Sequence, residues 1–60
     1  MVIYEIEELY FDGCQYLHEQ SWYYADKGKA EYEYELLYEA KTDDRIAYNI
    51  YNIEVNEDVL

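Results

Sequence analysis

Carboxylates are the side chains of this sequence with the greatest potential for specific chemistry. Fifteen Asp and Glu residues stand against four Lys and Arg residues, so the 60-residue chain carries a net charge of −11. Glu31, Glu35 and Glu39 recur at every fourth position, which would place them about 6 Å apart along a helix. Glu5 and Glu7 would lie about 6.6 Å apart along a strand. Successive phosphates of one DNA strand rise about 3.4 Å along the duplex axis, and lie further apart through space, so the spacings are of the same order.

The glutamates of the acidic stripe at residues 31–39 are expected to lack local partners for their charge. A solvated, salt-bridged helix usually carries a lysine four residues after each glutamate, but Lys27, Lys29 and Lys41 stand only at the edges of this segment. An acidic surface repels nucleic acid and membrane phosphates and attracts basic surfaces, of which DNA-binding clefts are among the strongest. The sequence therefore suggests a protein that inhibits a DNA-binding enzyme by presenting carboxylates where phosphates would sit.

Catalysis and metal binding find little support in the sequence. Cys14 and His18 could form a nucleophile and base, but on one strand they would lie about 13 Å apart, and no third group is evident to orient the base. No Asp-x-Asp-x-Asn-Gly calcium loop is present, and so short a chain offers little wall for a substrate pocket. We expect no enzyme activity, no cofactor, no metal, and no binding of nucleic acid or membrane by the chain itself.

The elements that position these groups can be read from turn signals and side-chain alternation. Asp12-Gly13 is a hairpin signal between alternating segments, which predicts paired strands at residues 2–11 and 14–24. A polar loop is expected at residues 25–29. After the polar turn at residues 41–44, the β-branched and aromatic segment 45–55 predicts a strand covered on both faces, followed by a short tail at 56–60.

The segment from Ala30 to Ala40 fits two patterns. Tyr32, Tyr34 and Leu36 alternate with glutamates, as in a strand, whereas a helix would place one apolar group on a single face: Ala30, Tyr34, Leu37 and Tyr38. Its alanines and leucines favour the helix, with Gly28 before its start. The predicted fold class is α+β, a β-β-α-β chain in which one helix covers a three-stranded antiparallel sheet.

The chain is short for an independent domain, and residues 1–60 are predicted to form a single one. Domains of this size are marginal and usually need a disulfide, a metal or a partner chain. Only one cysteine and one histidine are present. We therefore expect a homodimer at micromolar concentration, in which a second copy covers the sheet face away from the helix. The absence of a basic leader and of a long apolar run, with a lone cysteine, favours a cytoplasmic location.

Ten tyrosines supply a second kind of binding surface. Tyrosine gives rigid, amphipathic contact area and is common at interfaces, although cross-strand packing in a small sheet also uses it. Tyr34 and Tyr38, beside the acidic stripe, are the predicted contact residues. Trp22 and Tyr24 are expected in the core or in a dimer interface.

Two short motifs carry a resemblance to a known family. One is the run from Tyr34 to Tyr38 (Tyr-Glu-Leu-Leu-Tyr), followed by Thr42-Asp43-Asp44 and Ile46, and the other is the turn Asp12-Gly13-Cys14-Gln15-Tyr16. The first is similar to the end of the single helix, the acidic turn and the last strand of the compact dimeric phage inhibitors of uracil-DNA glycosylase, and the second resembles their Asp-Gly hairpin. Here a tyrosine stands where the family has phenylalanine in the form best known to us, and the turn after Tyr38 is a residue longer.

The resemblance implies a function and a set of contact residues. Such inhibitors block the DNA cleft of the host's base-excision enzyme and so protect phage DNA from uracil excision. Acidic groups replace phosphates, and an apolar pocket in the dimer takes the enzyme residue that wedges into DNA. By motif position, Tyr34, Glu35 and Tyr38 would contact the enzyme. The whole predicted partner-binding set is Tyr34, Glu35, Tyr38, Glu31, Glu39 and Leu37.

Two other functions fit the same composition. The target could be another nucleic-acid enzyme, such as a restriction or CRISPR nuclease, with the same mechanism. Alternatively, the protein could be a structural dimer whose charge serves only solubility. Salt dependence separates a phosphate mimic from a structural dimer, because a phosphate mimic binds its basic partner more weakly as salt rises.

Overall fold

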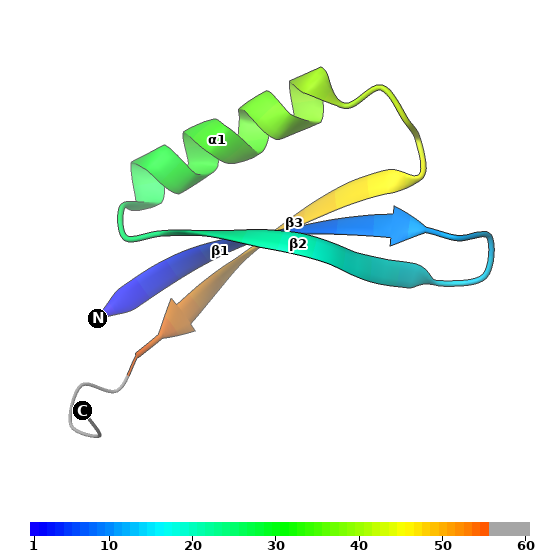
Figure 1. The fold of residues 1–60 in the computed structure, drawn as a ribbon. Helices are drawn as coiled ribbons and strands as arrows, with labels where there is room; N and C mark the ends of the chain where they lie inside the picture. The colour runs from blue at the N-terminus through cyan, green and yellow to red at the C-terminus, as the bar shows by residue number, and fades with distance from the viewer. Residues whose placement is uncertain (56–60) are drawn as a thin grey trace.

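Within residues 1–55, three strands and one helix follow one another in the order β-β-α-β, and the helix lies across one face of the sheet (Figure 1). The computed structural model describes residues 1–55, so the tail predicted at 56–60 lies outside the described residues. The elements are β1 (Val2–Phe11), β2 (Tyr16–Tyr24), α1 (Lys27–Ala40) and β3 (Ile46–Glu54). This arrangement confirms the predicted α+β fold class and the helical alternative for residues 30–40.

β1 is the central strand, since the sheet order is β2-β1-β3 and both pairings are antiparallel. Its alternate residues point to opposite faces. Ile6 faces the helix and is fully buried together with Ala30 of α1, and Tyr48 of β3 is nearly so. Trp22, the cross-strand partner of Ile6, is half-buried, with its ring 6.5 Å from the ring of Tyr48. The core is therefore small and lies in a single layer between helix and sheet.

The hairpin between β1 and β2 differs from the predicted two-residue turn, because β2 begins at Tyr16 and not at residue 14. The Asp12 carboxylate accepts hydrogen bonds from the backbone N–H groups of Cys14 (2.8 Å) and Gln15 (2.9 Å), and Gly13 has φ +104°. These bonds stabilise a longer turn of the Asx type. A bulge at Glu19 of β2, opposite Glu8 and Leu9 of β1, shifts the register again, so the cross-strand neighbours differ from those of a two-residue turn.

α1 begins earlier than predicted, at Lys27, and takes in most of the expected loop. Asp26 is the N-cap, and its side chain accepts a hydrogen bond from the N–H of Lys29 at 2.8 Å. That bond satisfies an otherwise unpaired donor of the first turn. Gly28 therefore lies inside the helix and not before it.

In the single chain, β3 is covered only on its helix-facing side, and the cover of its opposite face by a second copy remains a prediction. Tyr48 is buried under the helix, but Tyr51 and Ile53 on the opposite face are exposed. The described part of the chain contains no helix long and apolar enough to cross a membrane.

Candidate protein-binding surface

The predicted acidic stripe forms along one flank of α1. Glu31, Glu35 and Glu39 are all exposed, and helical periodicity places them on one side of the helix, about 6 Å apart along its axis. Lys27 lies within the first turn of the longer helix, and its Nζ is 3.9 Å from a carboxylate oxygen of Glu31. The expectation that all three glutamates lack local partners is therefore wrong for Glu31. Within residues 1–55, Glu35 and Glu39 have no ion-pair partner.

Tyr34 and Tyr38 lie next to the stripe but point from the helix toward β3. Their hydroxyls donate hydrogen bonds to the same backbone carbonyl of Tyr48, at 3.2 and 3.3 Å. The two rings meet edge to face, with centroids 5.0 Å apart. Tyr34 is half-buried, whereas Tyr38 keeps 41% of its surface exposed beside the stripe. Tyr38 therefore combines a structural hydrogen bond with an accessible ring, and Tyr34 is mainly a packing residue in the single chain.

The remaining apolar groups of the helix divide between its two sides. Leu37 is half-buried and shares the sheet-facing side with Ala30. Leu36 is 41% exposed and borders the acidic stripe on the side away from Tyr38. Of the predicted contact residues, Glu35, Glu39 and Tyr38 are thus exposed on neighbouring parts of the helix surface. Glu31 is exposed but forms an ion pair with Lys27. Leu37 and Tyr34 are half-buried and pack between the helix and the sheet.

In the acidic turn before β3, one of the two carboxylates, that of Asp43, is hydrogen-bonded within the turn. The Asp43 carboxylate accepts hydrogen bonds from the Arg45 guanidinium at 3.0 and 3.1 Å and from the Arg45 backbone N–H at 2.9 Å. The Arg45 side chain lowers the pKa of Asp43. Asp44 is exposed, and within residues 1–55 it has no ion pair. Of this acidic pair, only Asp44 is available to a partner.

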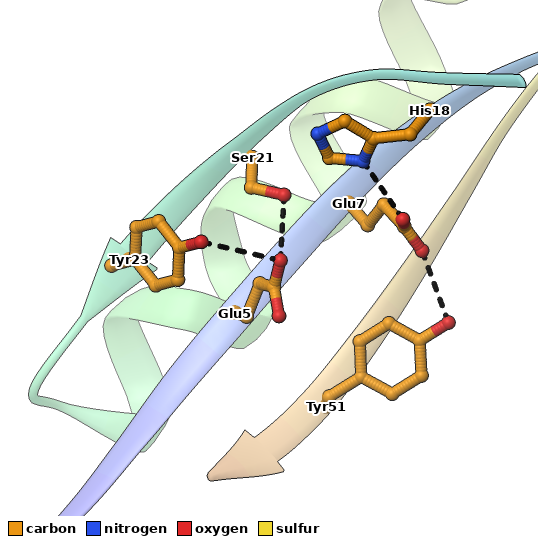
Figure 2. A network of polar contacts seen from close by, with 6 residues as sticks. All are labelled: Glu5, Glu7, His18, Ser21, Tyr23 and Tyr51. Atoms are coloured by element: carbon orange, nitrogen blue, oxygen red, sulfur yellow. Dashed lines mark hydrogen bonds and ion pairs between the residues drawn. The ribbon is translucent and has the colours of Figure 1, made fainter.

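A second group of carboxylates lies on the sheet face opposite the helix (Figure 2). Glu5 accepts hydrogen bonds from Ser21 at 2.6 Å and Tyr23 at 3.5 Å. Glu7 is 2.8 Å from Nδ1 of His18 and accepts a hydrogen bond from the Tyr51 hydroxyl at 3.1 Å. The hydrogen bond with His18 is the main cause that lowers the pKa of Glu7. This face is therefore polar and internally bonded at its centre.

The spacing of Glu5 and Glu7 along a strand was predicted, but their hydrogen-bond partners were not. His18 was predicted to share a face only with Cys14, which lies exposed in the turn and not on a strand. A two-residue turn would have placed His18 directly opposite Glu7, but the longer turn places it opposite Leu9 instead. The two side chains meet diagonally across neighbouring strands. No group of three or more His, Cys, Asp or Glu side chains among residues 1–55 could hold a metal ion.

Two tyrosine hydroxyls make the stability of the fold dependent on pH in the alkaline range. Burial, with a smaller effect from the Tyr38 hydroxyl, raises the pKa of Tyr34 from 10.0 to about 12. Burial and the hydrogen bond to Glu8 raise the pKa of Tyr48 to about 12. Because both folded-state pKa values lie above the unfolded value, the stabilisation is complete below pH 10.0 and is lost as the pH rises toward 12.

We expect the free energy of unfolding to fall steeply between pH 10.0 and about 12. Urea denaturation, with tyrosinate absorbance recorded in parallel, measures this fall. Tyr34→Phe should make the fall shallower, and Tyr32→Phe, at an exposed helix position, should leave it unchanged. An equal effect of the two variants would contradict the special role of Tyr34.

No protein-family profile, curated protein or solved structure matches this chain.

Proposed function

We propose that this protein is a homodimeric inhibitor that occupies the DNA-binding cleft of an enzyme by mimicking DNA phosphates. Its proposed target is uracil-DNA glycosylase, following the resemblance in the run from Tyr34 to Tyr38. The inhibitor would act in the cytoplasm of a phage-infected host and block uracil excision there. The protein would bind no DNA itself and perform no catalysis.

The observation that carries this proposal is the flank of α1 that holds Glu35 and Glu39. Both carboxylates are exposed, regularly spaced and without an ion-pair partner among the described residues. Like charges four residues apart on a helix destabilise it slightly, and a net charge of −11 destabilises any compact state. A basic partner surface would relieve this repulsion on binding.

Exposed apolar groups beside the carboxylates support mimicry of DNA over a surface that is only acidic, because they can take the place of bases beside the phosphates. Tyr38 borders the stripe on one side, and Leu36 borders it on the other. Base-flipping enzymes act on a nucleotide taken out of the duplex stack. The exposed apolar groups on α1 would contact the enzyme residue that fills the vacated space. In the proposed dimer, two such helices would contribute to one pocket.

The test is uracil excision by a bacterial uracil-DNA glycosylase with increasing amounts of the protein. We expect complete loss of activity near one dimer per enzyme, with weaker inhibition as salt rises because exposed charges are screened. Full enzyme activity would exclude uracil-DNA glycosylase as the target. It would not exclude phosphate mimicry directed at another nucleic-acid enzyme, and nucleases are the next targets to assay. Inhibition that does not change with salt would contradict phosphate mimicry.

A further inference from the structure

β3 is an edge strand without the protective features that such strands usually carry. In natural proteins, lysine, proline, bulges or short length keep an edge strand from pairing with a strand of another chain. β3 has nine residues, pairs with β1 in an unbroken register and contains no lysine, proline or glycine. β2, at the other edge, carries Glu19 at the bulge in its register. The edge formed by β3 is therefore the more open to another strand.

The hydrogen bonds to β1 show which backbone groups of β3 face outward. Val55 N–H donates to the Met1 carbonyl at 2.8 Å, and Phe11 N–H donates to the Arg45 carbonyl at 2.8 Å. In an antiparallel ladder such bonded pairs alternate, so the odd-numbered residues of β3 bond to β1. The N–H and C=O groups directed away from β1 belong to Ile46, Tyr48, Ile50, Asn52 and Glu54.

The helix occupies the first half of this edge and leaves the second half open. Tyr34 and Tyr38 both donate to the outward carbonyl of Tyr48. An added strand would have to displace these two hydrogen bonds at Tyr48. From Ile50 to Glu54, no side-chain hydrogen bond from the described residues covers the outward groups, so pairing there disrupts nothing.

The distribution of charge points to a second copy of this chain as the occupant. Self-association of a chain with net charge −11 is opposed by repulsion wherever carboxylates meet. Residues 45–53 form the longest stretch of the sequence without Asp or Glu. β3 thus offers two copies the surface at which they repel each other least.

We infer that two copies pair antiparallel through the second halves of their β3 strands, centred on Asn52. In that register Asn52 faces Asn52 of the second copy, and Tyr51 lies directly opposite Ile53 of the second copy. Tyr51 and Ile53 are 43% and 37% exposed in the single chain, on the face away from the helix. Their positions form pairs not bonded through the backbone, where side chains approach most closely. The pairing covers this apolar surface and joins the two sheets into one.

Asn52→Pro tests the pairing without touching the bonds between β1 and β3. Proline removes an N–H that faces outward, so it is tolerated at an edge but blocks a further strand. The matched control is Tyr23→Pro, whose N–H faces outward on β2 by the same alternation. By sedimentation at micromolar concentration, wild type and Tyr23→Pro should be dimers. Asn52→Pro should be a folded monomer by circular dichroism, with dimerisation weakened at least 100-fold.

A cross-link provides a second measurement that does not depend on a proline. In a Cys14→Ser background, Asn52→Cys would bring two new thiols into a bonded pair with a Cα separation of about 5.5 Å, which suits a disulfide. Mild oxidation should give a covalent dimer, whereas Glu19→Cys in the same background should not. A monomeric wild type, or a dimer indifferent to Asn52→Pro and without the cross-link, would overturn the pairing. Since no enzyme is present in these assays, their outcome is separate from that of the inhibition assay.

Discussion

Replacing Glu35 with lysine should abolish inhibition of the target enzyme while leaving the chain folded. Glu35 is exposed and, within residues 1–55, has no ion-pair partner, so the folded chain loses no ion pair. At the enzyme, an attractive contact with a basic cleft becomes a repulsive one. Loss of one partner in a buried interfacial charge pair costs about 2–5 kcal/mol. That corresponds to a rise in the inhibition constant from roughly 30-fold to several thousand-fold.

The control for this experiment is Glu19→Lys, which makes the same change in net charge on β2. Glu19 is exposed and lies at the opposite edge of the sheet from β3. Its replacement should slow association only a few-fold, through the overall field of the molecule. Equal losses for the two variants would show that only net charge matters, and unchanged inhibition by Glu35→Lys would remove this residue from the interface.

Truncating Ile6 to alanine should remove most of the stability of the fold. Ile6 is fully buried at the centre of the middle strand, where its neighbours are Trp22 and Ile50. Such truncations in a core cost about 2–5 kcal/mol. At about 0.05–0.15 kcal/mol per residue, a chain of this length has only some 3–9 kcal/mol to lose. Urea denaturation followed by circular dichroism and by Trp22 fluorescence should show a large loss or complete unfolding.

Leu36→Ala is the matched control, because it removes a similar aliphatic group from an exposed helix position. Alanine is also the better helix former, so the change in unfolding free energy should stay within about 0.5 kcal/mol. All variants must be compared at one protein concentration, since the proposed dimerisation would add to the apparent stability. A small effect of Ile6→Ala would mean that the single-layer core is not what stabilises the chain.

Local sequence signals determined most of the elements. Alternation over residues 2–11 and β-branched residues over 45–55 identified β1 and β3, because side-chain period follows backbone geometry directly. Residues 30–40 fit both a helix pattern and a strand pattern, and the structure shows the helix that the alanines and leucines of this segment favoured. The start of α1 was missed because Asp26 was interpreted as part of a loop, although it is a strong N-cap residue two positions before Gly28.

Cross-strand neighbours could not be obtained from the same signals. The Asp12 carboxylate lengthened the hairpin turn, and the bulge opposite Leu9 moved the register once more. Each change in register alters every pair beyond it. The contact between His18 and Glu7, and the bonds from Ser21 and Tyr23 to Glu5, depend on that register and were therefore not predicted.

The sequence by itself determined the acidity of the chain, its lack of a disulfide and the spacing of Glu31, Glu35 and Glu39, since these follow from composition and helical period alone. Only the tertiary structure decided that β1 is central, that Lys27 reaches Glu31, and that Tyr34 and Tyr38 hydroxyls cover the Tyr48 carbonyl. It also left the second half of β3 as an open edge with few charges. The physical reason is that strand order and helix position are set by packing between segments far apart in sequence, on which local periodicity carries no information.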